Sequence, residues 1–465
     1  MRVTRVTGAL SAIVGLAAVT AISAAPVPAI AAPPARRTIS TQTIAPGLTL
    51  TKISDPSGPY MLRVLTIDPT KPLTIDIATA GAIGTYARTS TVGDAHGALA
   101  AINGDFTVDP GRPLHPFAED GSLRELGFQN GASFAISKDE ASVYIDKEAV
   151  GVRGKDVTAK HAFSVAEWNT ADPKGGDIVG YTPYGGDGSR PPQDACSVRL
   201  KVAGKMTFGK NGVGVSRDYK VVRSRCTSTA MAMRAGTTVL SSKTSGAGAT
   251  VLKSMKRRHI VRLRWSFGWS DVMDSVGGMP LLVQAGVPVA PATCSSYFCS
   301  RNPRTGIGVT ADGKILMVTV DGRKSSSVGM TLIGFAKYMV QLGAQYAVNL
   351  DGGGGSTMWV NGLGVVNDPS DSTGERPVTN TVLVLPGADP GEPATMSGPQ
   401  YGLPGLTSVT PAVSAAAASR AAALSATDPG SIGGLMDALV SGDFGSSSAL
   451  PPAFQRYARI FRAAR

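Results

Sequence analysis

Short runs of hydrophobic residues, bounded by turn residues, make up most of the chain between about residues 45 and 386. Most runs are rich in β-branched residues or alternate with polar ones, a pattern typical of β-strands. The runs 62–67 and 73–78 are joined through Asp68-Pro69-Thr70, so we expect them to form a strand pair. The predicted strands in this part of the chain are 62–67, 73–78, 98–102, 142–145, 198–202, 221–222 and 259–265.

The clearest pattern lies between residues 305 and 385. Two apolar runs, 306–310 and 314–320, flank Asp312-Gly313, a strong signal for a β-hairpin. Residues 330–342 then repeat apolar positions with the period of a helix, and 346–350 is again a strand. The order strand–helix–strand predicts a βαβ unit with parallel strands.

Each of the two strands of this βαβ unit ends in an Asp-Gly pair. Parallel strands end at the same edge of a sheet, so Asp321, Arg323 and Asp351 are predicted to lie near one another at that edge. Such an edge is where ligands bind in open sheets. Asp-Gly pairs also form ordinary turns, and that alternative stays open.

Four consecutive glycines follow Asp351. Ordering them is entropically costly, which favours a role in which bare backbone approaches an anion or a sugar oxygen. We therefore expect Gly352, Gly353 and Gly354 to bind substrate through backbone N–H groups, with hydroxyl donors from Ser356 and Thr357.

Glu375 and Arg376 precede the last predicted strand, 378–385. The pair is either a surface salt bridge or an acid and a guanidinium at the rim of the same pocket.

These patterns predict an α+β fold: a single large mixed β-sheet domain whose βαβ unit carries the site, followed by a disordered tail. The composition, with 43% hydrophobic and 17% charged residues, excludes disordered, collagen-like and coiled-coil chains. The predicted segments are a signal peptide (1–31), an N-terminal extension (32–59), the main domain (60–386) and an Ala/Ser-rich linker and tail (387–465).

The first 31 residues have the features of an export signal. Arg2 and Arg5 precede an apolar stretch, and Ala29-Ile30-Ala31 offers a cleavage site. No later segment resembles a transmembrane anchor, so the mature protein is expected to be secreted or extracellular, with wall association as an option. The four cysteines then predict two disulfides, and proximity in the chain favours Cys196–Cys226 and Cys294–Cys299.

Six motifs occur between residues 101 and 380: AINGDF (101–106), SVGGMPLL (275–282), PRTGIGV (303–309), VTVDGR (318–323), NLDGGG (349–354) and GERPVTN (374–380). Together they resemble the phosphodiester glycosidase family, which includes the "uncovering enzyme" that removes N-acetylglucosamine from mannose-phosphate diesters. The motifs occur in the order of the family and span most of residues 60–386. Two positions depart from the family pattern, Asp105 and Gly355.

The resemblance implies hydrolysis of a sugar-1-phosphodiester at the sugar C1–O bond. The phosphomonoester that leaves has a second pKa of about 6. Cationic side chains that bind its oxygens can therefore replace a general acid. An oxocarbenium-like transition state needs a carboxylate as nucleophile or base, and Asp351 ranks first. The other candidates are Asp321 and Glu375 as catalytic groups, Arg304, Arg323 and Arg376 as the phosphate clamp, and Asn103, Asp105 and Asn349 as substrate-binding groups.

No cofactor is required by this chemistry, although a divalent cation such as Ca²⁺ among Asp and Asn oxygens is an open alternative. The net charge of +12 fits a glycan or glycosyl-phosphate substrate, or an anionic cell-envelope polymer. Aromatic residues make up 6% of the chain and form no basic–aromatic stripe, so nucleic acid is not expected as a partner. Three alternative functions stay open: a hydrolase of phosphate-free wall polysaccharide, a phosphodiesterase that breaks the P–O bond, and a non-catalytic wall-glycan binding protein. Arg456, Arg459 and Arg462 of the tail are interpreted as a solvated helix face, with contact to an anionic wall polymer as the alternative.

Overall fold

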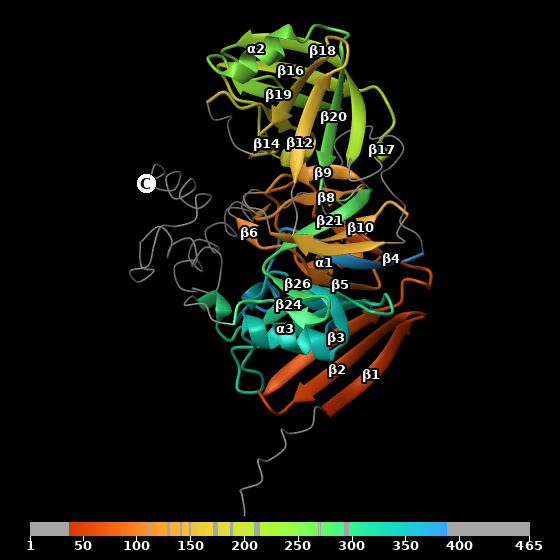
Figure 1. Ribbon diagram of the computed structural model, residues 1–465. Helices are drawn as coiled ribbons and strands as arrows, with labels where there is room; N and C mark the ends of the chain where they lie inside the picture. Colours follow the sequence, from red (N-terminus) through yellow and green to blue (C-terminus); the bar gives the residue numbers. More distant parts are fainter. Residues whose placement is uncertain are drawn as a thin grey trace, which may run out of the picture. The chain divides into compact units, whose positions relative to one another are not determined.

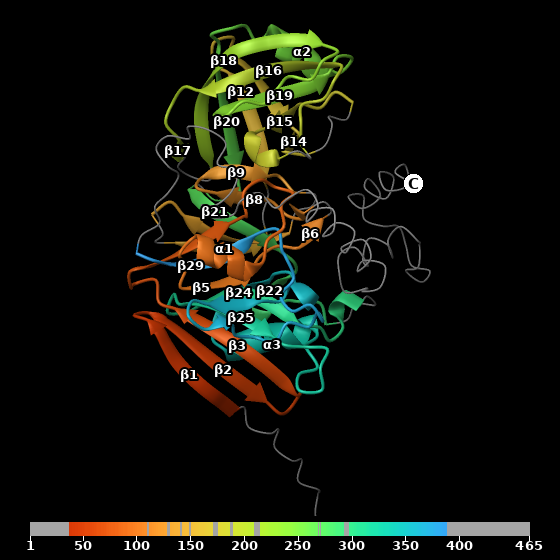
Figure 2. The ribbon, with the colours of Figure 1, turned by 180° about the vertical axis from the view of Figure 1, so that it is seen from behind.

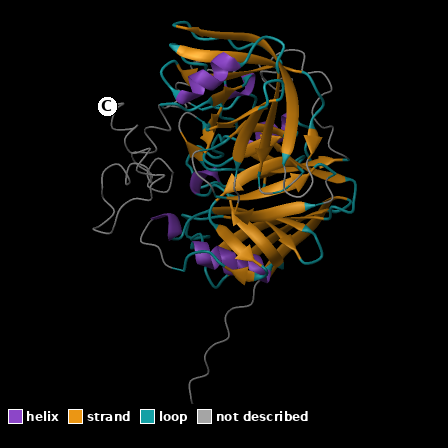
Figure 3. Ribbon diagram, turned by 45° about the horizontal axis from the view of Figure 1, so that its top comes forward, coloured by secondary structure: helices purple, strands orange, loops and turns teal. Residues whose placement is uncertain are grey.

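The structure, a computed structural model, is built mainly of β-strands (Figures 1 and 3). It describes residues 37–387 except 109–110, 128–130, 140–141, 148–149, 171–174, 187–188, 209–213, 268, 270 and 293–296. The predicted signal peptide, nearly all of the predicted tail and Cys294 lie outside the described residues. Among the described helices, none is long and apolar enough to cross a membrane.

An eight-stranded sheet carries the two Asp-Gly strand ends that the sequence singled out. Its strands, in the order β1-β2-β3-β25-β24-β26-β22-β23, pair antiparallel throughout. One face packs against α3 (Leu332–Gln341), whose first turn is capped by Thr331 Oγ1 accepting from the Gly334 N–H at 3.1 Å. The strands are β1 (Arg37–Ala45), β2 (Leu48–Asp55), β3 (Tyr60–Ile67), β22 (Leu281–Gln284), β23 (Val287–Pro288), β24 (Arg304–Thr310), β25 (Ile315–Val320) and β26 (Ala344–Asn349).

The other face of this sheet packs on a five-stranded sheet ordered β28-β27-β5-β29-β4. Alternation along the strands separates two cores. In β29, for example, Val382 and Val384 face the eight-stranded sheet, whereas Leu383 and Leu385 pack with α1 (Thr89–Ala95). The strands are β4 (Leu73–Ala78), β5 (Ala100–Asn103), β27 (Met358–Val360), β28 (Gly364–Val365) and β29 (Thr381–Pro386). The result is a layered arrangement of helix, sheet, sheet and helix.

Two smaller sheets and three short 3₁₀ turns complete this part of the molecule. The larger sheet has the order β11-β10-β21-β8-β9 and shares the central core through Phe134 and Val276. Its strands are β8 (Phe117–Glu119), β9 (Ser122–Glu125), β10 (Ala132–Ser137), β11 (Val143–Lys147) and β21 (Val272–Gly278). The other elements are the pair β6 (Thr107–Val108) and β7 (Arg112–Pro113) and the turns η1 (Pro183–Gly185), η2 (Tyr297–Cys299) and η3 (Gly353–Gly355).

The segment between β11 and β21 folds into a nine-stranded sheet with its own core, seen from both sides in Figures 1 and 2. Helix α2 (Ala247–Ser254) packs on this core through Leu252. Two hydrogen bonds tie the sheet to β9: Trp168 Nε1 donates to Leu123 O (2.9 Å) and Asn169 Nδ2 to Arg124 O (2.7 Å). The strands are β12 (Gly151–Asp156), β13 (His161–Val165), β14 (Glu167–Trp168), β15 (Val179–Tyr181), β16 (Ala195–Val202), β17 (Thr207–Phe208), β18 (Val215–Thr227), β19 (Thr237–Lys243) and β20 (Ile260–Ser266).

Several sequence predictions need correction. The strands form separate sheets rather than one mixed sheet, and the described pairings are antiparallel except β14–β15. The predicted pairing of 62–67 with 73–78 is wrong, because β3 pairs with β2 and β25, whereas β4 pairs with β29. Residues 37–55, from the predicted N-terminal extension, form β1 and β2 of the main sheet.

The βαβ unit is not confirmed as predicted. The hairpin of β24 and β25 and the helix α3 are present, but β24 lies between β25 and β26. Because both outer strands are antiparallel to β24, they run in the same direction and end at the same edge. Asp321 and Asp351 therefore follow strand ends at the edge where β24 begins with Arg304.

Candidate active site

Asn103, the last residue of β5, joins the two layered sheets at this edge. Its side-chain oxygen accepts from Thr305 Oγ1 of β24 (2.8 Å) and from the Thr357 N–H (3.0 Å). Its Nδ2 donates to the carbonyl of Asp351 (2.8 Å). Asn103 is fully buried, so its amide holds the loop after β26 in place rather than presenting itself to a ligand.

Asp351 is the central titratable group of this edge. Its side chain retains some exposure, and Oδ1 accepts from the Gly352 N–H at 2.9 Å. Burial of the carboxyl raises its pKa from 3.8 to about 7, with a further rise from the Asp105 carboxylate. Arg376, the Gly352 N–H and Arg323 act in the opposite direction and lower the pKa. A carboxyl with a pKa near neutrality can change protonation state during a reaction at physiological pH.

The glycines after Asp351 are required by close approaches. A Cβ on Gly354 would lie 2.1 Å from Asp371 Oδ1 and 2.2 Å from Arg376 Nη2. A Cβ on Gly355 would lie 2.5 Å from Asp351 Oδ2. All three distances are far below van der Waals contact, so charged side chains pack directly on bare backbone. The glycine run therefore brings Asp351, Asp371 and Arg376 together over one short loop.

Two guanidinium groups lie beside this loop. Arg376 forms a two-pronged ion pair with Asp371, from Nε to Oδ2 (2.8 Å) and from Nη2 to Oδ1 (3.0 Å). Arg323 has a φ of 62° and contacts neutral groups, Ser370 Oγ at 3.4 Å and Asn302 Oδ1 at 3.2 Å. A non-glycine residue in this left-handed region is strained, and such strain gathers at functional sites. The two arginines provide positive charge where an anionic group could bind.

Asp105 and His115 form a buried pair next to Asp351. Asp105 Oδ1 lies 2.7 Å from His115 Nδ1, and Oδ2 accepts from the His115 N–H at 2.8 Å. The Asp105 N–H in turn donates to Asn380 Oδ1 at 2.7 Å. Both side chains of the pair are fully buried. Asp105 therefore orients the imidazole and adds negative charge near Asp351.

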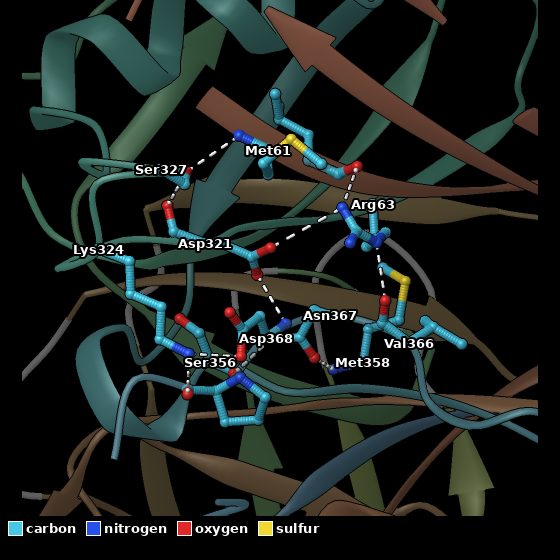
Figure 4. Close-up of polar contacts among 12 residues, drawn as sticks. Met61, Arg63, Asp321, Lys324, Ser327, Ser356, Met358, Val366, Asn367 and Asp368 are labelled. Atoms are coloured by element: carbon cyan, nitrogen blue, oxygen red, sulfur yellow. Dashed lines mark hydrogen bonds and ion pairs between the residues drawn. The ribbon is translucent and has the colours of Figure 1, made fainter. Parts of the chain in front are cut away.

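Asp321 is held by structural contacts (Figure 4). Its Oδ1 accepts from the Asp368 N–H at 2.9 Å, and its Oδ2 lies 3.8 Å from Arg63 Nη1. Burial raises its pKa, and Arg63 and the Asp368 N–H lower it. The Asp321 carboxylate thus fastens the loop before Ser370 and Asp371, which in turn contact Arg323 and Arg376. Its contacts fit a positioning role.

Glu375 and Arg304 are likewise occupied. Glu375 accepts from the N–H (2.7 Å) and the hydroxyl (2.6 Å) of Ser90 in the first turn of α1. Arg304 is 2% exposed and donates to the backbone carbonyls of Met330 (2.9 Å), Phe298 (2.8 Å) and Ser300 (2.7 Å). Burial, and the nearby charge of Arg323, lower the pKa of Arg304 to about 9. Glu375 thus caps α1, and Arg304 supports the loop before β24.

Four buried polar atoms around the glycine loop have no hydrogen-bond partner among the described residues. Asn349 donates through Nδ2 to Met279 O at 2.7 Å, which leaves its Oδ1 without a donor. The others are Ser356 Oγ, Thr357 Oγ1 and Asn380 Nδ2. Buried polar atoms are normally satisfied, so this group of atoms indicates a place for water or a polar ligand.

Sequence reasoning missed His115, Asp371 and Asn380. His115 lies in no motif that we used, and its role depends on Asp105, ten residues earlier. Asp371 could have been suspected, because it precedes the Glu375-Arg376 pair in an acidic, turn-rich segment. Asn380 ends the GERPVTN motif and could have been included on that basis.

The disulfide Cys196–Cys226 is confirmed and joins opposed residues of β16 and β18. Cys299 is also disulfide-bonded, and the Cys294 predicted to pair with it lies outside the described residues. Within the described part of the chain, no group of three or more His, Cys, Asp or Glu side chains is gathered as a metal site would require.

Comparison with solved structures relates the fold to bacterial proteins. A crystal structure from Burkholderia pseudomallei K96243, named as that of an exported protein, is 25% identical, with a TM-score of 0.51, over 71% of this chain and 75% of that one. A hypothetical protein from Synechocystis is 19% identical, with a TM-score of 0.58, over 75% and 63% of the two chains. The second likeness bears on the fold alone.

Two further similarities are more limited. The auto-inhibited catalytic domain of zebrafish N-acetylglucosamine-1-phosphodiester alpha-N-acetylglucosaminidase is 16% identical, with a TM-score of 0.39, over 76% of this chain and 87% of that one. The SPbeta prophage-derived protein YomE of Bacillus subtilis (strain 168) is 37% identical over 84 residues, 18% of this chain. The chain covers only 13% of the length of YomE.

A family comparison bears directly on the predicted resemblance. The model described as phosphodiester glycosidase matches residues 202–385, which include Asp321, Asp351 and Arg376. The resemblance predicted from the sequence is thus confirmed: residues 202–385 of the chain match the phosphodiester glycosidase family.

Proposed function

We propose that the protein is a secreted hydrolase that cleaves the sugar C1–O bond of a glycosyl-1-phosphodiester and releases a free sugar and a phosphomonoester. The observation that carries the proposal is the Asp351 carboxyl, with a pKa of about 7, under the influence of Arg323 and Arg376 at the glycine loop. The match to the phosphodiester glycosidase family supports the same reaction class.

In this mechanism the two arginines bind the phosphodiester. Guanidinium groups pair with phosphate oxygens through directed, charge-assisted hydrogen bonds. As the C1–O bond breaks, negative charge grows on the leaving phosphate, and Arg323 and Arg376 stabilise it in the transition state. The leaving group therefore needs no proton from a general acid.

Asp351 acts on the sugar carbon in its ionised form. The carboxylate either attacks C1 or takes a proton from the water that attacks C1, and in both cases it stabilises the positive charge that develops on the sugar. The Asp105–His115 pair and the amide of Asn380 hold the backbone next to Asp351 in position. Asn349 and Thr357 are as fully buried as Asn103, so we propose that the unpartnered Asn349 Oδ1 and Thr357 Oγ1 bind water beneath the glycine loop.

The pKa of Asp351 predicts the pH dependence of the reaction. With a pKa of about 7, Asp351 is protonated in about half of the molecules at pH 7, and only the molecules with an ionised Asp351 react in this mechanism. We expect kcat/KM to rise with pH and to level off above about pH 8. A rate that falls through the same range would assign Asp351 the role of an acid.

The proposed place of action is outside the cell, on a bacterial cell-wall or other extracellular phosphoglycan. The Cys196–Cys226 disulfide supports this, because disulfides persist in oxidising compartments. Measuring export of the full chain from an expressing bacterium would test it: appearance only in the cytoplasmic fraction would contradict secretion.

The reaction is tested with N-acetylglucosamine-1-phospho-methyl ester in ¹⁸O-labelled water, with both products followed by mass spectrometry. Label in the sugar demonstrates C–O cleavage, whereas label in the phosphate demonstrates P–O cleavage and overturns the mechanism. The Asp351→Asn variant is the control, because it keeps the shape of the site and removes the reacting carboxylate.

A further inference from the structure

The positive charge of the chain is concentrated in one segment. Residues 195–266 contain sixteen lysines and arginines and a single acidic residue, Asp218. The net charge of the whole chain is +12, so the remaining residues together are slightly negative. The segment forms β16 to β20 of the nine-stranded sheet, which holds none of the candidate catalytic residues.

Strand register places several of these cations on one face of the sheet, opposite other cations. Between β16 and β18, Arg199 lies opposite Arg223 and Lys201 lies opposite Lys220. Two further pairs continue the face between β12 and β20: Arg153 with Arg264, and Lys155 with Arg262. Like charges directly opposite across strands are destabilising, and this face repeats that arrangement four times.

The opposite face of the sheet is the core face. Val198 and Leu200 alternate with the cations of β16 and pack, with Leu252 of α2, in the core of this sheet. The cations face away from that core, and Lys201, Lys220 and Arg223 are exposed. The aliphatic parts of these lysine and arginine side chains therefore do not shield that core from water.

Acidic counter-charge on this face is sparse. Asp218 is already engaged by Arg262, with N–O distances of 2.6 and 2.8 Å. Arg199 is buried and has a pKa lowered by burial and by the charges of Arg234, Arg223 and Arg225. The Nε atoms of Arg199 and Arg225 are buried and have no hydrogen-bond partner among the described residues. Arg199 and Arg225 donate through Nη2 to the backbone carbonyls of Ala232 and Ala230, which satisfies hydrogen bonds without neutralising their charge. An anion bound beside these guanidiniums would relieve their mutual repulsion.

We propose that this cationic face, defined by Lys201, Lys220, Arg223, Arg153, Arg264 and Lys155, binds a linear polymer whose charges are phosphodiesters joined by sugars or polyols. The repeated rows of cations are complementary to a chain with regularly spaced negative charges. Arginine, which is frequent on this face, pairs with phosphate in a two-pronged geometry.

The same face is poorly suited to single-stranded nucleic acid. The face positions of β12, β16, β18 and β20 carry no aromatic side chain on which bases could stack. A phosphodiester polymer is also the kind of molecule that contains the bond cleaved in the proposed reaction, and this link to the substrate rests on the proposed function. The sheet then acts as a binding surface that retains the polymer near the site.

The binding test uses the full chain carrying Asp351→Asn, so that turnover does not interfere. The probe is poly(glycerol phosphate) of defined length, titrated at several NaCl concentrations. Single-stranded DNA, polyglutamate and hyaluronate of matched total charge are the comparison polymers. We expect the tightest binding for poly(glycerol phosphate) and a linear fall of log K with log salt concentration.

Matched variants locate the surface. The triple change Lys201→Gln, Lys220→Gln, Arg223→Gln removes three face cations. The control Lys253→Gln, Lys256→Gln, Arg257→Gln removes three exposed cations from α2 and the turn after it, on the core-face side. We expect the face variant to lose about tenfold or more in affinity and to flatten the salt slope by about 2 to 3. The control should change affinity by less than about threefold, as expected for distant surface charges.

Three outcomes would overturn the proposal. Equal weakening by both variants would mean general charge attraction rather than a defined face. Equal or tighter binding of DNA, polyglutamate or hyaluronate would exclude recognition of a phosphodiester glycan. Loss of binding with a lowered unfolding temperature would mean that the cations have a structural role, whereas removal of like-charge pairs should raise that temperature slightly. Polymer binding without cleavage of any diester would reject the proposed function and leave the binding face intact.

Discussion

The site region and the nine-stranded sheet use charge in different ways. Around the glycine loop, Asp105, Asp321 and Arg304 are buried and hydrogen-bonded to backbone groups. On the nine-stranded sheet, Lys201 and Lys220 are exposed and opposite one another. The first arrangement fixes side chains for chemistry at one point, and the second spreads charge over a surface.

The space around the glycines also differs between the two regions. A Cβ on Gly354 would collide with two charged side chains, whereas a Cβ on Gly151, in the nine-stranded sheet, would meet nothing within 4 Å. Net charge is therefore a poor guide to the candidate site of this protein. The candidate site is better recognised by crowded glycines, buried ionisable groups and polar atoms without partners.

The largest effect is expected from removing the reacting carboxylate. Asp351→Asn should lower kcat on the methyl diester by about 10³-fold or more, as for other glycosidases that lose a nucleophile or base. Product release followed by mass spectrometry gives the rate. Asp321→Asn is the comparison, and we expect a much smaller loss because Asp321 holds a loop. Equal losses would show that the two carboxyls act together.

Asp351→Asn should also change how the stability of the protein depends on pH. Burial raises the pKa of Asp351 to about 7 in the folded protein, above its unfolded value near 4. The folded state then binds the proton more tightly, so wild-type stability falls as pH rises from about 4 to 7. Asp351→Asn has no such charge and should unfold a few degrees higher than wild type at pH 8. The difference should vanish near pH 4, and its persistence there would contradict the assignment.

The disulfide should affect only the nine-stranded sheet. Cys196 and Cys226 are 30 residues apart, and closing a loop of that length is worth about 3 to 4 kcal/mol in the chain-entropy description. Replacing both by Ser should lower the free energy of unfolding by that order, measured in urea. We expect kcat on the methyl diester at 25 °C to stay within about twofold. A large loss of kcat would show that the two regions are coupled.

The sheet edge that carries Asp321 and Asp351 was predictable because strand ends are readable in the sequence. The Asp-Gly pairs after 314–320 and 346–350 do leave the sheet at one edge. The intervening β24 was missed as the central strand, because the helical period of 330–342 suggested direct parallel pairing. An antiparallel strand between two parallel neighbours produces the same edge, so the prediction placed Asp321 and Asp351 correctly for the wrong topological reason.

What could not be predicted depends on contacts between distant residues. Glu375 lies beside Arg376 in the sequence, but its carboxylate is bound to Ser90, 285 residues away. His115 enters the site only through Asp105. The cations of residues 195–266 are visible in the sequence, but only the strand register shows which of them share a face: Arg199, Lys201, Lys220, Arg223, Arg262 and Arg264.

The two glycines provide a smaller and more local test. Gly354→Ala should displace Asp371 and Arg376 from the loop, because its Cβ would lie about 2 Å from both side chains. We expect kcat/KM on the methyl diester to fall about 10- to 100-fold, with most of the change in KM if Arg376 binds phosphate. Gly151→Ala is the matched control in the nine-stranded sheet and should leave kcat/KM unchanged. An active Gly354→Ala enzyme would mean that the loop tolerates rearrangement.

The smallest effect should come from Glu375. Its carboxylate accepts two hydrogen bonds from Ser90 at the start of α1, where negative charge is also favoured by the helix dipole. Glu375→Gln keeps one acceptor oxygen and removes the charge, which should cost about 1 kcal/mol in the free energy of unfolding. Because α1 packs on the far side of the five-stranded sheet from the central core, kcat at 25 °C should fall by less than about twofold. A loss of kcat close to that of Asp351→Asn, with unchanged stability, would instead support the sequence prediction that Glu375 is a catalytic residue.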